Sequence, residues 1–175
     1  MTGNTTIPKV FLRAMEPEDL DYLYRIENDA DLWGVGVTNV PYSRYALHDF
    51  IANATGDIYT DKQVRLMVDD ETHRTVGIVD LMNFAPRHHR AEVGIVIEKQ
   101  CRGRHLALAA LGELHHYAYH VLHLHQLYAI VAESNTAARQ LFIVNGYIHS
   151  GLLRHWLFNG ENYEDACLMQ AMLLK

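Results

Sequence analysis

The sequence predicts a single mixed α/β domain over residues 1–175, built on a largely antiparallel sheet. Apolar and polar residues alternate with period two in three runs between residues 63 and 98, which is typical of an antiparallel meander. An apolar stripe with helical spacing then runs from Leu106 to Val121. Near the C-terminus, two strand-like runs are joined by Asn159-Gly160, a strong hairpin signal.

The expected order is strand, two helices, three strands, helix, strand, helix and two strands. Strands are expected at residues 10–15, 63–68, 75–84, 90–98, 126–132, 147–158 and 164–173. Helices are expected from the acidic Pro-containing start at residue 16, from a Ser43 cap to about residue 54, over 106–121, and from Ser134 or Asn135 to Asn145-Gly146. Residues 31–41, with two glycines and a proline, predict a loop, and residues 69–71 predict a turn.

Composition and charge argue against several classes of protein. With 15 Lys+Arg against 21 Asp+Glu, the net charge of −6 speaks against a general nucleic-acid partner. No apolar run reaches the roughly 20 residues that span a membrane, and residues 1–9 lack the apolar region of a signal peptide. Cys101 and Cys167 give no disulfide or zinc spacing, so a reducing, cytoplasmic location is expected.

A basic, glycine-containing turn at residues 100–105 leads from an apolar strand into the long helix. A helix N-terminus carries unpaired N–H groups and a partial positive charge. Gly103 lets a ligand approach the backbone, and Arg102 and Arg104 add positive charge, so the turn is a candidate phosphate site. It lacks the Lys-Ser/Thr of a P-loop and two glycines of the dinucleotide fingerprint. An ordinary basic helix start has the same local pattern.

Four segments in this order resemble the GNAT acetyltransferase superfamily, closest to the branch of ribosomal-protein alanine and spermidine N-acetyltransferases. They are residues 90–95, 100–107, 135–147 and 153–165, and the resemblance extends over residues 10–173. It implies an α/β, GNAT-like, mostly antiparallel sheet flanked by helices and splayed between its fourth and fifth strands. It also implies acetyl-CoA as co-substrate and direct transfer of its acetyl group to a primary amine.

The resemblance implies the residues that contact acetyl-CoA. They are Ile95, Val96, Ile97, Cys101, Arg102, Gly103, Arg104, His105, Leu106, Ala107, Asn135 and Phe142. Among them, a backbone N–H around Val96 is expected to polarise the thioester carbonyl as an oxyanion donor. The N–H groups between Cys101 and Ala107 are expected to bind the pyrophosphate, and Asn135 the pantetheine arm.

Glu92 is the candidate general base. An alkyl ammonium has a pKa near 10, so a base must remove its proton before the nitrogen can attack. Glu92 stands at the matching strand position, although an ordinary half-exposed strand carboxylate is the alternative. Gly94, two residues later, marks either a bulge that frees a backbone group or a plain packing glycine.

Two departures from the family pattern keep a second function open. Phe142 stands where spermidine-type enzymes place a Tyr that protonates the leaving thiolate, so slow or water-assisted transfer is expected here. Tyr147 and Cys101 do not clearly replace that Tyr. His105 stands where the pattern has Gly or Ala, and its side chain either crowds the phosphates or hydrogen-bonds them. The alternative function is a catalytically degenerate acetyl-CoA-binding protein with a regulatory or assembly role.

The substrate is less readable from the sequence. Trp33 lies in the loop expected to cover the cleft and is a candidate substrate contact. Residues 34–41 carry no carboxylate, which weakens a polyamine assignment and leaves a small amine or a peptide N-terminus open. A homodimer is expected from the resemblance. His116 and His120 lie four residues apart on one helix, but without further metal-ligand spacing we expect no metal.

Overall fold

The computed structural model describes residues 7–33 and 40–173. Its strands are β1 Val10–Ala14, β2 Val64–Asp70, β3 Thr75–Ala85, β4 Arg90–Ile97, β5 Gln126–Ala132, β6 Ile148–Phe158 and β7 Tyr163–Met172. Its helices are α1 Leu20–Glu27, α2 Ala30–Trp33, α3 Arg44–Asn53, α4 Ile58–Asp61, α5 Leu106–His120 and α6 Thr136–Val144, with 3-10 turns η1 Pro17–Asp19, η2 Pro86–His88 and η3 Lys99–Cys101.

The seven strands form one sheet in the order β1-β2-β3-β4-β5-β7-β6. Neighbouring strands are antiparallel except for the central pair, β4 and β5, which run parallel. The mixed, mostly antiparallel α/β class predicted from the sequence is therefore confirmed.

The central parallel pair is short. The rungs that join β4 to β5 are Arg90–Gln126, Ala91–Leu127 and Glu92–Tyr128. Beyond Glu92 the rest of β4 stays paired with β3, while the rest of β5 stays paired with β7. Within these strands the sheet is thus splayed between its fourth and fifth strands, as the resemblance implies.

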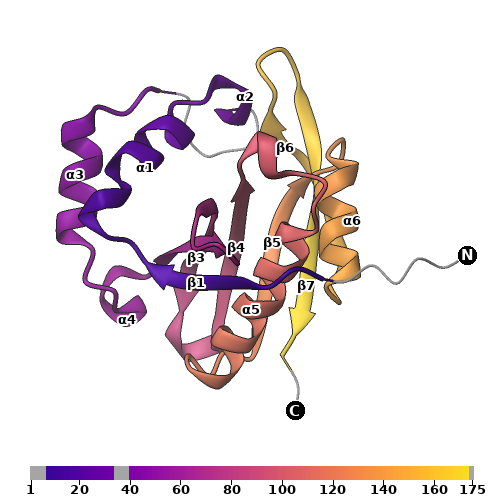
Figure 1. Cartoon of the computed structure of the whole chain (residues 1–175). Coiled ribbons are helices and arrows are strands. Elements are labelled where there is room, and N and C mark those ends of the chain that lie inside the picture. The colour runs from indigo at the N-terminus through magenta and orange to yellow at the C-terminus, as the bar shows by residue number, and fades with distance from the viewer. Residues whose placement is uncertain (1–6, 34–39, 174–175) are drawn as a thin grey trace, which may run out of the picture.

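Helices cover the two faces of the sheet, and each face has its own core (Figure 1). Residues of α5 and α6 pack with the main core, and α1 and α3 form a smaller core over β2, β3 and β4. Because strand side chains alternate, Ala91, Val93 and Ile97 enter the main core. Glu92 and Gly94 consequently lie on the opposite face, the one that carries α1 and α3.

Local signals set most helix starts. The Ser43 hydroxyl accepts from the Ala46 N–H, and the Asn135 side chain accepts from the Ala138 N–H, so both predicted caps are confirmed and Asn135 is the cap of α6. The apolar stripe of α5 is buried at Leu106 and Leu114, but Val121 is 58% exposed. Val121 is the C-cap of α5, beyond the turns that pack on the sheet, so its predicted burial is wrong.

Two other sequence predictions are corrected. Residues 31–33 belong to helix α2 rather than to a loop, and residues 34–39 of that predicted loop lie outside the described residues. Asp69 and Asp70 extend β2 instead of forming a turn, which falls at residues 71–73. Asp69 is buried and accepts hydrogen bonds from Arg13 and Thr75, and these contacts keep it in the strand.

None of the helices in residues 7–33 and 40–173 has the length and apolar character needed to cross a membrane.

Candidate active site

Glu92 lies on the last rung before β4 and β5 part. It is half-buried, and its rung partner on β5 is Tyr128. Paired residues on neighbouring strands direct their side chains to the same face, so both lie on the face that carries α1 and α3. This carboxylate therefore stands at the mouth of the gap between the two strands.

A bulge in β3 brings a third polar side chain to Glu92. The β3–β4 register shifts between Met82 and Ala85, and Asn83 within this stretch has a positive φ of 49°. The Asn83 Nδ2 group donates a 2.8 Å hydrogen bond to Glu92 Oε2. Sequence reasoning missed Asn83, because the bulge that aims its side chain has no signature in the sequence.

The two edges of β4 can be told apart by their hydrogen bonds. Just beyond the strand, the Glu98 N–H donates to the Val76 carbonyl at 2.9 Å, so this backbone group faces β3. On the other edge, the His89 carbonyl accepts from the His125 N–H at 2.7 Å. The Ile97 carbonyl also faces outward, because it accepts a 3.0 Å bond from Arg102 Nε.

These bonds fix where the amides of β4 point. Successive residues of a strand direct their backbone groups to opposite edges, so even-numbered residues of β4 face β3 and odd-numbered residues face β5. The N–H of Val96 therefore faces β3. The N–H groups of Ile95 and Ile97, which lie beyond the last rung, point into the gap. The resemblance implies an oxyanion donor around Val96, and with these strand edges the candidates that point into the gap are the N–H groups of Ile95 and Ile97, on either side of Val96.

The β4–α5 connection forms a cationic, exposed rim above the gap. Arg102, Gly103, Arg104 and His105 are all exposed, whereas Cys101 is buried beneath them. Helix α5 has no acidic residue in its first turn, and its N-cap, His105, makes no side-chain capping bond. The first amides of α5, at Leu106 and Ala107, thus stand at a helix N-terminus suited to the phosphates of CoA.

His105 adopts a left-handed backbone conformation, with φ 59° and ψ 14°. This region favours glycine because an L side chain there is strained. Of the two residues that the family pattern has at this position, glycine would relieve this strain, whereas alanine would keep it. Gly103 also has a positive φ, 75°.

Glu98, at the start of the β4–α5 connection, ties this connection to other parts of the fold. It is 5% exposed and accepts a 2.8 Å ion pair from Arg25 of α1 and a 3.2 Å pair from Arg74 of the β2–β3 turn. Gln100 Nε2 donates to the same carboxylate at 2.9 Å. Sequence reasoning missed Glu98, whose partner Arg25 lies 73 residues away along the chain.

Phe142 is a core residue in this structure. It is 3% exposed, and its ring packs edge-on against Tyr147 at a centroid distance of 4.8 Å. Tyr147 is 2% exposed and its hydroxyl lies 3.0 Å from His115 Nε2. Burial raises the pKa of Tyr147 and lowers that of His115, which favours the neutral form of both groups. The Tyr147 hydroxyl already pairs with His115 of α5. This fits the expectation that Tyr147 does not replace the tyrosine that the family pattern has at position 142.

Asn135 has a structural task besides its expected contact with the pantetheine arm. Its Oδ1 accepts a 3.0 Å bond from the Ala138 N–H and caps α6. Trp33 is the last residue of α2, and its side chain lies outside the described part of the structure. Its expected contact with the substrate remains a prediction.

A second group of charges lies beside Glu92 on the same face. Arg65 donates to both oxygens of Asp80, at 2.7 and 3.0 Å, and also pairs with Glu27 of α1. Asp80 faces Gly94 across the β3–β4 ladder, and a Cβ at Gly94 would lie 3.1 Å from the end of Met82. Gly94 is therefore a position of close packing, the plainer of its two predicted roles.

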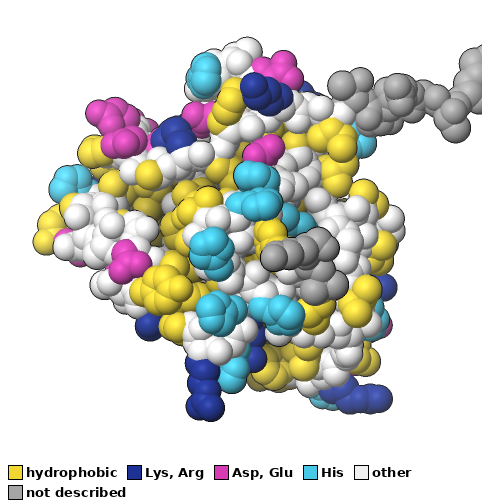
Figure 2. Space-filling model, turned by 90° about the horizontal axis from the view of Figure 1, so that it is seen from below, with side chains coloured by type: hydrophobic (Ala, Val, Ile, Leu, Met, Phe, Trp, Pro, Cys, Tyr) yellow, Lys and Arg dark blue, Asp and Glu magenta, His cyan; other side chains and the backbone are white. Residues whose placement is uncertain are grey.

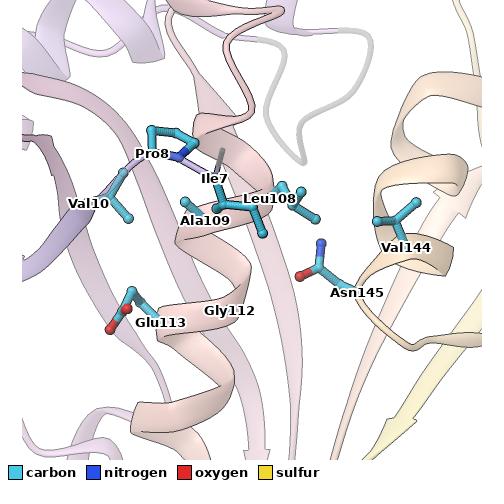
Figure 3. A pocket seen from close by; sticks show the side chains of 9 residues that line it. All are labelled: Ile7, Pro8, Val10, Leu108, Ala109, Gly112, Glu113, Val144 and Asn145. Atoms are coloured by element: carbon cyan, nitrogen blue, oxygen red, sulfur yellow. The ribbon is translucent and has the colours of Figure 1, made fainter. Parts of the chain in front are cut away.

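Two pockets lie elsewhere on the molecule. One, of about 350 Å³, lies between α5 and the end of α6, where Ile7 and Pro8 cross beside Leu108 opposite Val144 and Asn145 (Figure 3). It adjoins the first turn of α5. The other pocket, at the end of α5, is lined by Tyr119, His120, His123 and Leu124.

Histidine side chains gather over the face seen in Figure 2. On α5, the rings of His116 and His120 lie 4.5 Å apart, centroid to centroid. In the part of the chain that the structure describes, no group of three or more His, Cys, Asp or Glu is placed to hold a metal ion.

Known proteins share this architecture. A family model described as an acetyltransferase (GNAT) domain matches residues 9–148. The chain is 30% identical to spermidine N(1)-acetyltransferase of Escherichia coli (strain K12), over 94% of this chain and 88% of that protein. It is 25% identical to the crystal structure of spermidine N-acetyltransferase from Vibrio cholerae in complex with CoA and spermine, with a TM-score of 0.84. That match covers 94% of this chain and 95% of the other.

A dodecameric structure of the Vibrio cholerae enzyme in an intermediate state is also similar, with a TM-score of 0.78 at 25% identity over 94% of each chain. The family match spans most of this chain, and the splayed sheet and basic helix start agree with it. The chain belongs to the GNAT acetyltransferase family: it is an N-acetyltransferase, and acetyl-CoA is its co-substrate.

Proposed function

We propose that this chain acetylates polyamines and that Glu92 is the general base. The observation that carries the proposal is the position of Glu92, a carboxylate on the last β4–β5 rung beside the outward-facing amides of Ile95 and Ile97. This arrangement supplies a proton acceptor and oxyanion donors on one strand, along one edge of the gap. The similar enzymes named above act on spermidine, which supports the choice of substrate class.

The proposed reaction is direct transfer. Glu92 removes a proton from the substrate ammonium, and the amine nitrogen attacks the thioester carbonyl carbon. The amide of Ile95 or Ile97 stabilises the oxyanion that forms. The carbon–sulfur bond then breaks and the nitrogen gives up its second proton to water, while the thiolate takes a proton from water, because Phe142 has none to give.

Charge on the sheet face supports a polycation. Glu27, Asp80 and Glu92 lie there together, and Arg65 compensates part of their charge. These carboxylates come from α1, β3 and β4 rather than from the loop at residues 34–41, which carries none. The named relatives are enzymes, which favours catalysis over a degenerate acetyl-CoA-binding protein.

The test is an assay of CoA thiol release with spermidine, spermine, butylamine and a short peptide with an N-terminal alanine. We expect kcat/KM for the polyamines to exceed that for butylamine at least about tenfold, as two or more charges bind instead of one. Glu92→Gln should lower kcat by about 10²- to 10³-fold, in the range of general base catalysis.

Glu18→Gln, an exposed carboxylate in η1, is the matched control and should keep wild-type activity. A preference for the peptide would replace polyamines with a protein N-terminus as substrate. Full activity of Glu92→Gln would exclude Glu92 as the base.

We further propose a homo-oligomer in the cytoplasm. The dodecameric relative supports self-association, and the homodimer expected from the sequence is one form that it can take. Cys101 and Cys167 are both buried and free, which fits a reducing compartment. Light scattering should give a mass at least twice the 20.0 kDa of one chain, and a mass of one chain would contradict self-association.

A further inference from the structure

We infer that Tyr128 is a positioning residue that holds the Glu92 carboxylate in place at the mouth of the β4–β5 gap. The inference rests on the proposed role of Glu92 as the base. The sequence by itself predicts only that this tyrosine belongs to a strand.

The sheet places Tyr128 beside Glu92. The two residues form the last rung of the parallel pair, so their side chains project from neighbouring strands, about 4.8 Å apart, on the same face. Leu127 and Ala129, on either side of Tyr128, are buried in the main core, which confirms that the tyrosine ring points the other way. The ring is half-buried on the face that carries Glu92.

The electrostatics at Tyr128 fit a hydrogen bond to Glu92. Burial raises the pKa of the phenol most, the charge of Glu92 raises it further, and a side-chain hydrogen bond with Glu92 adds to this, while Arg90 opposes. A phenol with a raised pKa keeps its proton at neutral pH. Between a protonated phenol and a carboxylate, the phenol must donate.

Three strands then converge on one carboxylate. Asn83 reaches Glu92 from the β3 bulge with its 2.8 Å bond to Oε2, and the last rung places Tyr128, on β5, next to Glu92, where we infer the second bond. Two donors from opposite sides restrict rotation of the carboxylate, whereas either one alone leaves a torsional freedom. Misplacing a reacting group by about 1 Å costs on the order of 10²-fold in rate, so the orientation of the base has kinetic weight.

The experiment compares Tyr128→Phe with the wild type in the thiol-release assay with spermidine. The phenylalanine keeps the ring and removes only the hydroxyl. We expect kcat to fall about 10- to 100-fold, with the KM for acetyl-CoA within about twofold of wild type. The low-pH limb of kcat/KM should move to higher pH, because a carboxylate that loses a donor is protonated more readily.

Three further comparisons separate positioning from a structural effect. Tyr117→Phe, a half-buried phenol on α5 whose pKa is raised by burial alone, should keep the wild-type kcat and pH profile. In the double variant Glu92→Gln, Tyr128→Phe, activity should equal that of Glu92→Gln alone, since Tyr128 acts through Glu92. Asn83→Ala, an exposed position outside the core, should show the same shift of the low-pH limb.

Several outcomes overturn the inference. One is a kcat of Tyr128→Phe within twofold of wild type; another is a loss that recurs in full in the Glu92→Gln background. A rise in the KM for acetyl-CoA that accounts for the whole effect would assign the hydroxyl to binding. If Glu92→Gln itself is fully active, the proposed base fails first; if Glu92→Gln is inactive and Tyr128→Phe is not, only the positioning role fails.

Discussion

The histidine that caps α5 combines an imidazole side chain with a backbone that suits glycine. Among the described residues, seven non-glycine positions have a positive φ, and His105 is one of five histidines in that group; the others are His73, His89, His123 and His155. A left-handed conformation costs an L residue roughly 1–2 kcal/mol. His105, with this strained backbone, lies where the phosphates of CoA are expected.

Replacing His105 tests whether the imidazole crowds or assists the phosphates. Because His105 has a left-handed backbone and no capping bond, we expect His105→Gly to bind acetyl-CoA several-fold more tightly by calorimetry. His105→Ala keeps the strained Cβ and should be about 1 kcal/mol less stable than His105→Gly. Weaker binding by the glycine variant would show that the imidazole hydrogen-bonds the phosphates.

At the scale of elements, two connections hold the predicted CoA site in shape. One is the Glu98 cluster, which ties the β4–α5 connection to α1 and to the β2–β3 turn. The other is the contact between His115 on α5 and Tyr147 just after α6. In each, a buried side chain, Glu98 or Tyr147, meets partners that lie far away along the chain.

Glu98→Gln should loosen the first connection. It removes the charge that both arginines face inside a buried site, so we expect a loss of about 2 kcal/mol in the free energy of unfolding. Acetyl-CoA should bind several-fold more weakly, because the loop that presents the first amides of α5 loses its anchor. Asp21→Asn removes an exposed carboxylate paired with Arg44, and should change stability by less than about 0.5 kcal/mol.

The contact between His115 and Tyr147 predicts that stability depends on pH. Burial holds the pKa of His115 below its ordinary value of 6.5, so just below pH 6.5 the unfolded chain binds a proton that the folded protein does not. Stability therefore rises with pH in this window and falls as pH drops below 6.5, with a slope of at most about 1.4 kcal/mol per pH unit from this residue.

His115→Gln removes the titrating group and should flatten the unfolding free energy between pH 5 and 6.5 in denaturant titrations. His116→Gln, the exposed neighbour on α5, is the control and should keep the wild-type slope. An unchanged slope in His115→Gln would mean that another group governs this window.

At the scale of the whole molecule, the sheet consists of two parts joined by the three β4–β5 rungs. The first part, β1 to β4, carries Glu92, Asn83 and the outward amides. The second part, β5 to β7, carries Tyr128. The proposed catalytic residues therefore come from both parts of the sheet, and a ligand in the gap would contact both.

Acetyl-CoA should consequently stabilise the fold as a whole. A ligand at 100 times its Kd adds about 2.7 kcal/mol to a native state that alone binds it. We expect the Tm in thermal scans to rise steadily with acetyl-CoA concentration, and free adenine to have no such effect. A Tm independent of acetyl-CoA at millimolar concentrations would contradict the predicted cradle.

The sequence predicted what is local and missed what the sheet brings together. The basic turn before α5, the Asn135 cap and the strand position of Glu92 follow from patterns within a few residues. Asn83, Tyr128 and Glu98 were missed because their roles depend on a bulge, a parallel rung and ion pairs between distant segments. The choice of Ile95 and Ile97 as candidate oxyanion donors required the observed hydrogen bonds at the two edges of β4. Alternation alone does not say which residues face β3 and which face β5.

The outward amides of β4 also make the gap observable by hydrogen exchange. Val96 and Gly94 direct their N–H groups to β3, whereas those of Ile95 and Ile97 face the gap beyond the last rung. Deuterium should therefore enter one strand unevenly, fast at Ile95 and Ile97 and slowly at Gly94 and Val96. A bound acyl donor that accepts from these amides would slow the fast pair alone, so two backbone signals would report occupancy without any assay of turnover.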